Sequence, residues 1–482
     1  MNFRMVLKII GTVMKYEAIL LLLPLFVALY YRQSDAYAFL VTALITFPIG
    51  LILSKIKINK KEMYAKEGFL IVGISWIIIS FVGGLPFVIS GAIPSIIDSF
   101  FETVSGFTTT GATILTEIES LPKGILFWRS LTHWIGGMGF LIFILALIPS
   151  LGSNTIHLLK AESAGPSPSK IVPKMKETAK ILYLIYFALT ILETVLLMFA
   201  GLSFYDAIIH ALGTAGTGGF SNKNASVVAF NNPAAEWIIT VFMLLFGVNF
   251  ALYFYVIKGK IKEALMGEEL RFYILTVISA TVLITINILD INGWNIGESI
   301  RQSAFQVSSI MTTTGYATTD FNLWPTFSKI ILLVLMFFGG MAGSTAGGVK
   351  NIRIVILAKT VRREINKILH PKSVKCVKID GRVVSEEVTS SVALYIVAYA
   401  MITLVAMFIV SIDGFDFTTT TTSVLTTINN VGPGFEMVGP VGNFSAFSGL
   451  SKIVLSLCML IGRLEIYPIL IMFSSSLWKR KY

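Results

Sequence analysis

Phe101-Glu-Thr-Val-Ser-Gly-Phe-Thr-Thr-Thr-Gly111-Ala-Thr113 is a half-apolar stretch that ends in a Thr-Gly pair, and three later stretches follow the same pattern. They read Ile208-Ile-His-Ala-Leu-Gly-Thr-Ala-Gly-Thr-Gly218-Gly-Phe220, Phe305-Gln-Val-Ser-Ser-Ile-Met-Thr-Thr-Thr-Gly315-Tyr-Ala317 and Thr422-Ser-Val-Leu-Thr-Thr-Ile-Asn-Asn-Val-Gly432-Pro-Gly434. Aligned on the glycine of each pair, the copies lie 107, 97 and 117 residues apart. A second glycine, inside an apolar run, follows each copy after 24 to 30 residues, at Gly136, Gly247, Gly339 and Gly462. Two landmarks in register four times predict a fourfold internal repeat.

The composition is that of a membrane protein. Of the 482 residues, 55% are apolar and 13% are charged, whereas a soluble domain carries about 25% charged residues. About 20 apolar residues are needed to cross the ~30 Å hydrocarbon core of a bilayer as a helix. We therefore predict an all-α polytopic membrane protein with ten candidate spans, near 6–31, 37–54, 69–90, 125–149, 181–202, 236–257, 272–290, 329–348, 389–412 and 453–478.

Each repeat is predicted to be a helix, a short re-entrant helix with a loop, and a second helix. The re-entrant segments are too short to span a bilayer, and irregular backbone at membrane depth is tolerated where it is buried or lines a water-filled path. Four such loops around one axis would direct carbonyl oxygens at one another, and carbonyl rings of this kind replace the hydration shell of a monovalent cation. Asn430-Val-Gly-Pro-Gly434 is close to the best-known filter sequence, Thr-Val-Gly-Tyr-Gly.

Basic residues predict the orientation. Thirty of the 38 Lys and Arg residues fall in six segments between the predicted spans, and such residues mark the cytoplasmic side of a membrane protein. These segments are 1–15, 55–66, 160–180, 258–271, 350–382 and 479–481. Both termini are therefore predicted to be cytoplasmic. The same asymmetry explains the net charge of +11, so we expect no nucleic-acid partner.

The sequence offers no set of residues for catalysis. Cys376 and Cys458 lie far apart, which argues against a disulfide framework, and no group of His, Cys, Asp and Glu has metal-ligand spacing. A membrane-embedded enzyme would need a nucleophile, an acid–base pair or a metal set at membrane depth. We find none and expect that the protein is not an enzyme.

Some polar residues lie inside apolar runs, where a charge is costly and therefore suggests a function. Arg463 and Glu465 are either functional or form structural ion pairs between helices. Because residues two apart do not share a helix face, we expect them to have different partners. The others are interpreted as an interfacial anchor (Arg129), as an ion relay or a buried carboxyl (Glu193), and as packing residues (His133 and His210).

These motifs resemble the Trk/Ktr/HKT superfamily of potassium transporters, and in particular its bacterial TrkH-type subunits. The stretches that carry the resemblance are Phe107-Thr-Thr-Thr-Gly-Ala-Thr113, Phe127-Trp-Arg-Ser-Leu-Thr-His-Trp-Ile-Gly-Gly-Met-Gly139, Thr214-Ala-Gly-Thr-Gly-Gly-Phe220, Thr312-Thr-Thr-Gly-Tyr-Ala317, Met341-Ala-Gly-Ser-Thr-Ala-Gly-Gly-Val-Lys350, Val377-Lys-Ile-Asp-Gly-Arg-Val-Val-Ser-Glu386 and Asn430-Val-Gly-Pro-Gly434. It covers the chain from about residue 65 to the end. The spans in 6–54 also fit the TrkH type, since Ktr-type subunits usually lack them.

The resemblance implies two N-terminal helices (1–64) followed by four pseudo-fourfold M1–pore helix–M2 repeats around one pore. The repeats would be 65–157, 158–262, 263–370 with an intramembrane gating loop, and 371–482. It also implies a homodimer with one pore per protomer in a bacterial cytoplasmic membrane. Potassium would be the transported ion, and nucleotide or NAD would bind only to a cytosolic TrkA-like regulatory ring, with no cofactor in the chain itself.

Carried over residue by residue, the family's potassium filter falls on Thr109–Thr113, Gly216–Phe220, Thr313–Ala317 and Asn430–Gly434. Within these ranges, the carried-over list of potassium-coordinating residues is Thr109, Thr110, Gly111, Ala112, Thr217, Gly218, Gly219, Thr313, Thr314, Gly315, Tyr316, Asn430, Val431, Gly432 and Pro433. A Ser in place of the first-repeat glycine accompanies sodium permeability in some plant members. All four aligned positions are glycine in this chain, which favours potassium.

The family's gate is a loop in the third M2 helix, with a basic residue of the fourth M2 below the filter. The matching residues are Gly339, Gly340, Gly343, Ser344, Thr345, Gly347, Gly348, Lys350 and Arg463. The glycine-rich window could instead be a close-packing seam between helices. Two other functions also remain open, a sodium-permeable pore and a proton- or sodium-coupled transporter. Alternating-access folds normally have two repeats rather than four.

Overall fold

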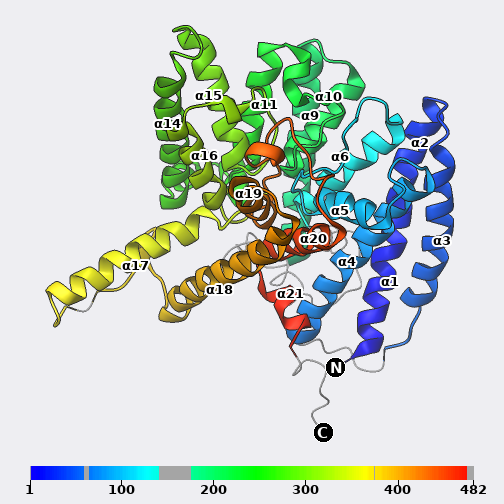
Figure 1. Ribbon diagram of the computed structural model, residues 1–482. Coiled ribbons are helices and arrows are strands. Elements are labelled where there is room, and N and C mark those ends of the chain that lie inside the picture. The colour runs from blue at the N-terminus through cyan, green and yellow to red at the C-terminus, as the bar shows by residue number, and fades with distance from the viewer. Residues whose placement is uncertain (1, 59–64, 140–174, 374, 475–482) are drawn as a thin grey trace.

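The computed structural model describes residues 2–58, 65–139, 175–373 and 375–474, and nearly all of its regular structure is helical (Figure 1). The exception within these ranges is a short antiparallel hairpin of β1 (Lys378–Ile379) and β2 (Arg382–Val383). In the described residues, six helices have the length and hydropathy of membrane spans, and one bent helix pair adds a seventh.

Two helical segments precede the repeats at one edge of the molecule (Figure 1). The first is interrupted once, as α1 (Phe3–Leu20) and α2 (Leu22–Tyr30), and α3 (Ala36–Ser54) packs against it. The turn before α3 is fastened to the first repeat. Gln33 accepts a hydrogen bond from the N–H of Lys123 (2.7 Å), and Asp35 accepts one from the N–H of Ile125 (3.1 Å).

Four units of long helix, short helix and second long helix follow. They are α4 (Ala65–Ile89), α5 (Ile96–Phe107) and α6 (Lys123–Gly137); α9 (Met175–Phe199), α10 (Phe204–Gly216) and α11 (Pro233–Phe246) with α12 (Phe250–Ile257); α14 (Glu268–Ile288), α15 (Ile296–Met311) and α16 (Thr326–Phe338) with α17 (Asn351–Leu369); and α18 (Glu386–Val410), α19 (Phe417–Ile428) and α20 (Gly449–Arg463) with α21 (Tyr467–Met472). The connections contain α13 (Ile261–Leu265) and the 3₁₀ turns Ser226–Phe230, Phe321–Leu323, Ser411–Asp413 and Glu436–Val438. This order confirms the predicted fold class.

The second long helix of a unit is shorter or more broken than predicted. The run 236–257 is not one helix, because Asn249 caps a new helix by accepting the N–H of Ala251 (2.9 Å), and α11 and α12 meet at 91°. The run 453–478 breaks after Arg463, where Ile466 has a φ of +71° and Pro468 opens α21. In the run 125–149, α6 ends at Gly137 and residues 140–149 lie outside the described residues.

Ion pairs fasten neighbouring units to one another. The Nζ of Lys452 on α20 lies 2.6 Å from a carboxylate oxygen of Asp98 on α5, which joins the fourth unit to the first. The Nε of Arg301 on α15 lies 2.9 Å from a carboxylate oxygen of Glu236 on α11, which joins the third unit to the second. The units therefore form a closed arrangement rather than an open row.

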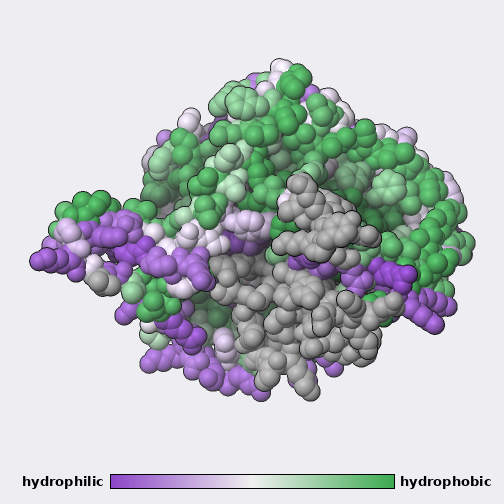
Figure 2. Space-filling model, turned by 90° about the horizontal axis from the view of Figure 1, so that it is seen from below, coloured by the Kyte–Doolittle hydropathy of each residue, from purple (hydrophilic) through white to green (hydrophobic). Residues whose placement is uncertain are grey.

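The surface separates into apolar and polar zones. Figure 2 shows hydrophobic residues over much of the flank, and hydrophilic residues along one rim and over the projecting helix at the left, which is α17. Along α17, Val361, Ile365 and Ile368 are exposed on the apolar side of the helix, and Arg362 and Lys367 are also exposed. The apolar flank agrees with a helix bundle surrounded by lipid.

Candidate functional site

The four short helices begin in the same way. In each, a capping side chain accepts a hydrogen bond from the backbone N–H three residues later; these caps are Ser95, Ser203, Asn295 and Asp416. Hydrogen bonds from the side chain and backbone of Thr419 lower the pKa of the Asp416 carboxyl. With 12 to 16 residues, these helices are about 18–24 Å long and cannot span the bilayer, as the sequence predicts. Their carbonyl ends carry partial negative charge, which favours a nearby cation.

Each short helix ends in the same irregular loop. A residue with positive φ comes first, then one with an ordinary φ, then a glycine with positive φ. The first positions are Thr109, Thr217, Thr313 and Asn430, and the glycines are Gly111, Gly219, Gly315 and Gly432. The middle residue always donates its N–H to the carbonyl five residues earlier, as Thr110 does to Ser105 (2.9 Å). We call these four segments, 109–113, 217–221, 313–317 and 430–434, the filter loops, after the role that the sequence resemblance predicts for them.

This geometry corrects the predicted alignment of the second repeat. The sequence pattern places Gly218 opposite Gly111, but Gly219 has the positive φ (+74°) and Gly218 does not. Gly218 instead corresponds to Thr110, Thr314 and Val431, so the residue that follows the filter glycine is Phe220. The carried-over residue list therefore omits Phe220 at the position of Ala112, Tyr316 and Pro433.

The filter loops form a closed ring. A Cβ atom at Gly111 would lie 2.1 Å from the carbonyl oxygen of Gly218 in the second loop. The same close approach repeats around the ring, from Gly219 to the oxygen of Thr314 (2.1 Å), from Gly315 to that of Val431 (2.3 Å) and from Gly432 to that of Thr110 (2.6 Å). Only glycine fits such contacts, because any other residue would place its Cβ against the neighbouring carbonyl oxygen. Four segments about 100 residues apart in sequence thus bring their carbonyl groups together.

Side chains also connect adjacent filter loops. The amide of Asn430 donates hydrogen bonds of 2.9 Å to the Thr110 hydroxyl and to the carbonyl oxygen of Met459, which ties the fourth loop to the first. The phenol of Tyr316 donates to the carbonyl oxygens of His210 (3.2 Å) and Phe220 (3.3 Å), which ties the third loop to the second. On one side, the loops line a cavity of about 130 Å³ that includes Thr113, Ser221 and Asn443.

The glycine-rich segment 339–350 is an irregular loop, as the sequence favoured over a helical seam. It lies directly against the ends of two short helices. The N–H of Gly347 donates to the Thr313 hydroxyl (2.6 Å), and the N–H of Gly348 donates to the carbonyl oxygen of Asn429 (2.9 Å). The Thr345 hydroxyl donates to the carbonyl oxygen of Phe246 in the second unit (3.2 Å). We call this segment the glycine loop.

Arg463 connects the glycine loop to the first unit. Its guanidinium donates hydrogen bonds of 2.7 Å to the carbonyl oxygens of Thr345 and Gly136, and another to that of Gly137. Lys350, only 3% exposed, turns back to the carbonyl oxygen of Ala346. Two basic side chains are therefore held by backbone carbonyls on the side of the filter loops where the glycine loop lies. A cavity of about 90 Å³ lies beside them.

The glycine loop is also fastened at its base. Glu269 on α14 accepts a hydrogen bond from the N–H of Ala342 (2.7 Å), and the N–H of Phe250 donates to the carbonyl oxygen of Gly343 (3.1 Å). Glu465 forms an ion pair with Arg353 on α17. Arg463 thus bonds to backbone carbonyls while Glu465 pairs with Arg353. The predicted reason does not apply, because α20 ends at Arg463 and Glu465, with a φ of +57°, lies beyond the helix.

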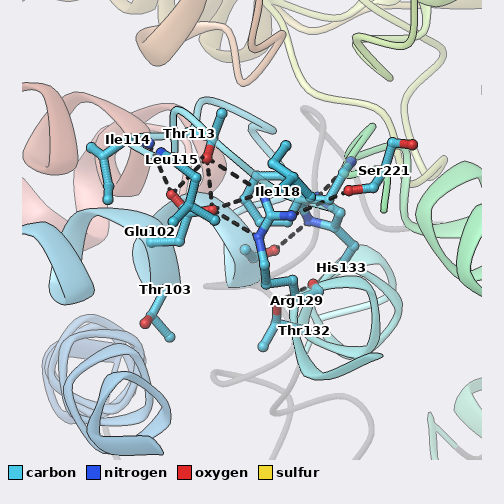
Figure 3. Close-up of polar contacts among 12 residues, drawn as sticks. Glu102, Thr103, Thr113, Ile114, Leu115, Ile118, Arg129, Thr132, His133 and Ser221 are labelled. Atoms are coloured by element: carbon cyan, nitrogen blue, oxygen red, sulfur yellow. Dashed lines mark hydrogen bonds and ion pairs between the residues drawn. The ribbon is translucent and has the colours of Figure 1, made fainter. Parts of the chain in front are cut away.

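Two residues interpreted as structural lie at the centre of the site instead. Arg129 is 2% exposed and forms an ion pair with Glu102 on α5 (Nη2 to Oε1, 2.8 Å), so it is not an interfacial anchor (Figure 3). His133, fully buried one helical turn later, contacts the carbonyl oxygen of Gly106 through Nδ1 (2.7 Å) and the N–H of Phe220 through Nε2 (3.2 Å). Their charge and polarity inside an apolar run were the only sequence signal.

The remaining polar residues are buried around the second unit. His210 contacts the carbonyl oxygen of Asp206 (2.8 Å) and the Ser221 hydroxyl (3.0 Å), which places it behind the second filter loop. Glu193 on α9 is fully buried, and a role as an ion relay stays a prediction. Within the described residues, no group of three or more His, Cys, Asp and Glu residues is placed to hold a metal ion.

A family model described as a cation transport protein, TrkH, matches residues 38–481. The chain belongs to the TrkH family of cation transport proteins. It is 38% identical to the Trk system potassium uptake protein TrkH of Salmonella typhimurium, with 99% of this chain and 100% of the relative covered. The TrkG protein of Escherichia coli is 34% identical, with 99% of both chains covered. The crystal structure of the potassium transporter TrkH from Vibrio parahaemolyticus matches with a TM-score of 0.89 and 34% identity, over 99% of this chain and 100% of that one.

Membership of the TrkH family agrees with the geometry. A TrkH-family chain is a multi-pass membrane transport protein rather than an enzyme, as expected from the sequence. The fold class, with four repeats after two N-terminal helical segments, is shared with the Vibrio protein.

Proposed function

We propose that this TrkH-family chain takes up potassium across the bacterial inner membrane through the ring of filter loops. The observation that carries the proposal is the closed series of close approaches from Gly111 to Gly218, Gly219 to Thr314, Gly315 to Val431 and Gly432 to Thr110. Carbonyl oxygens brought together in this way can replace the water around a potassium ion. The relatives are named for potassium uptake.

The filter residues in this proposal are those of the carried-over list, with Phe220 added. The four short helices direct the negative ends of their dipoles toward the inner end of the ring, which stabilises a cation there. Inward movement is driven by the membrane potential, worth about 2.3 kcal/mol per unit charge for 100 mV.

The glycine loop and Arg463 are proposed as the gate on the inner side of the filter. The loop contacts the second, third and fourth units directly and the first through Arg463. Apart from the bonds to Arg463 and Glu269, the loop is held by single hydrogen bonds between uncharged groups, so a displaced arrangement is accessible at modest cost.

A homodimer and a cytosolic TrkA-like regulatory ring that binds nucleotide or NAD belong to the proposal as well. The word "system" in the relatives' names agrees with a second component. The basic segments, including α17 with Arg362, Arg363 and Lys367, support a cytoplasmic position for this side and for both termini.

The proposal is tested by reversal potentials of purified protein in planar bilayers, with potassium on one side and sodium on the other. We expect a reversal potential close to that of a potassium-selective pore and unaffected by a pH gradient. A reversal potential near zero would indicate a sodium-permeable pore. A dependence on the pH gradient, or a need for sodium on the potassium side, would indicate coupled transport.

A further inference from the structure

Phe220, the residue after the second filter glycine, is held between two side chains of the first unit. The guanidinium carbon of Arg129 lies 4.1 Å from the centre of the Phe220 ring. The ring of His133 lies 4.2 Å from it, with 34° between the planes. Arg129 and His133 are four residues apart on α6 and therefore project from the same face of the helix. An arginine and an aromatic ring at this distance attract each other.

The same two side chains also bind the backbone of the second filter loop. The Nη1 of Arg129 donates to the carbonyl oxygen of Ser221 (3.2 Å), and the Nε2 of His133 accepts the N–H of Phe220 (3.2 Å). Because Nε2 is an acceptor, the ring hydrogen is on Nδ1, which donates to the carbonyl oxygen of Gly106 on α5. Two consecutive residues of the second loop are thus fixed from the first unit.

Glu102 extends this contact to the first filter loop. Both of its carboxylate oxygens accept the Thr113 hydroxyl (2.9 and 3.0 Å), and one accepts the N–H of Ile114 (3.0 Å). Arg129 and Glu102 are nearly inaccessible to solvent. A buried ion pair adds little net stability compared with an apolar replacement, but its directional hydrogen bonds fix geometry. This pair fixes the outer ends of two adjacent filter loops.

The arrangement occurs in one repeat of four. Arg129 and His133 lie seven and three residues before Gly136, the landmark glycine of the first repeat. The corresponding pairs in the other repeats are Thr240 and Leu244, Leu332 and Met336, and Leu455 and Met459. None of these side chains is charged, and Leu244, Met336 and Met459, which correspond to His133, have no strong acceptor for a backbone N–H. The contacts of Arg129 and His133 with the second filter loop are therefore specific to the first repeat and are not part of the fourfold repeat.

We propose that Arg129 and His133 are selectivity-determining positioning residues, which hold Phe220 and Ser221 so that the carbonyl oxygens of the second filter loop stay at a spacing suited to potassium. This inference rests on the proposed function. A loop whose outer end moves freely can close around a smaller dehydrated ion, so loss of the contacts admits sodium. The residues do not touch the ion and act through the loop.

Two pairs of variants test the inference. His133→Asn keeps a donor near Nδ1 but loses the acceptor for Phe220, whereas His133→Gln can supply an acceptor at the position of Nε2. Arg129→Lys keeps the charge but loses the planar fork that reaches Glu102 and Ser221 together. The double variant Arg129→Gln with Glu102→Gln removes both charges at similar volume, so no uncompensated charge is left buried. The control is Arg301→Lys, in the ion pair with Glu236 near the start of α15.

The measurement is the potassium-to-sodium permeability ratio from reversal potentials of the purified variants in bilayers. We expect His133→Asn, Arg129→Lys and the double variant to lower the ratio about tenfold, the effect of leaving one buried hydrogen-bonding group of the loop unsatisfied. His133→Gln and Arg301→Lys should stay within about twofold of the parent. The inference is wrong if Arg129→Lys or the double variant folds and keeps the parental ratio, or if the Asn and Gln variants at 133 behave alike. A parent protein without potassium selectivity would instead overturn the proposed function.

Discussion

The hydroxyl of Thr313 accepts a hydrogen bond of 2.6 Å from the N–H of Gly347, so a filter residue and the glycine loop are in direct contact. The neighbouring Gly348 donates to the carbonyl oxygen of Asn429 over 2.9 Å. The third unit therefore holds Gly347 of the loop, and the fourth unit holds the adjacent Gly348. Any displacement of the loop must break these bonds, so they are the natural place to test the gate.

Thr313→Ala should loosen the glycine loop, because it removes the acceptor for Gly347 at a buried position. The loss of one such bond is worth about 1 kcal/mol, which shifts a closed–open equilibrium about fivefold toward open. Flux of ⁸⁶Rb⁺ into proteoliposomes without any partner protein should rise accordingly. Thr313→Ser keeps the hydroxyl and is the matched control, with flux close to the parent. Equal flux in both variants would show that the hydrogen bond between Thr313 and Gly347 does not hold the glycine loop in its closed position.

The corrected register makes a second prediction. Gly219→Ser should lower potassium selectivity about tenfold, as should the same change at Gly111, Gly315 or Gly432, because a Cβ with positive φ would meet the next loop's carbonyl oxygen. The control is Gly201→Ser, at a glycine with a φ of +99° and no atom near its Cβ position. Reversal potentials in bilayers check both.

Gly218 should behave differently from Gly219. A Cβ at Gly218 would lie 2.3 Å from the ring of His133 rather than against a neighbouring filter loop. Gly218→Ala should therefore reduce the yield of folded protein, and adding His133→Ala should recover part of it. The same second change should not help Gly219→Ala. The yield of folded protein is measured by size-exclusion chromatography in detergent. If His133→Ala restores the yield of both glycine variants, or of neither, the original alignment of Gly218 with Gly111 would be supported.

Sequence repetition was enough to find the filter loops, because each short helix ends in the same run of backbone conformations. The one-residue slip in the second repeat arose because Gly218 and Gly219 are adjacent glycines. Only the backbone shows which of them has positive φ. The break after Gly247 had a local signal in Asn249, a good capping residue, but the apolar residues on both sides resemble one continuous span.

The role of Arg129 could not be predicted in the same way. Its partners Glu102 and Ser221 lie 27 residues before and 92 residues after it. A lone arginine near the start of an apolar run resembles an interfacial anchor. This interpretation was wrong because Arg129 lies six residues into α6, where it is buried and paired with Glu102. Contacts between residues so far apart in sequence depend on how the four units pack into a ring. No single segment of the sequence contains enough information to predict that packing.

Cysteine labelling tests the orientation. If the loops after the short helices lie outside, cysteines introduced at the partly exposed Lys223 and the exposed Glu436 should react with a membrane-impermeant maleimide in intact cells. A cysteine at Lys367 on α17 should react only after permeabilisation, because this helix belongs to a basic segment. The native Cys376 is exposed and should first be replaced by Ser, while Cys458 is buried. Labelling of position 367 in intact cells would reverse the orientation.

Arg463 allows a chemical test of how the gate excludes ions. Its guanidinium is held by the carbonyl oxygens of Thr345, Gly136 and Gly137, which are the kind of group that also binds a potassium ion. We therefore predict that the side chain occupies a position where a potassium ion would otherwise bind. Arg463→Ala should empty this position and raise flux several-fold, roughly the effect of 1 kcal/mol or more on the barrier.

Free guanidinium should then block Arg463→Ala from the cytoplasmic side at about millimolar concentration, an affinity near 4 kcal/mol. Urea has a similar shape without the charge and should not block. The parent should be insensitive to both, because its own guanidinium occupies the position, and Arg463→Lys should show partial closure. If flux rises in Arg463→Ala but guanidinium and urea act alike, Arg463 excludes cations by long-range repulsion alone. If flux does not rise, Arg463 holds the glycine loop in place without limiting conduction.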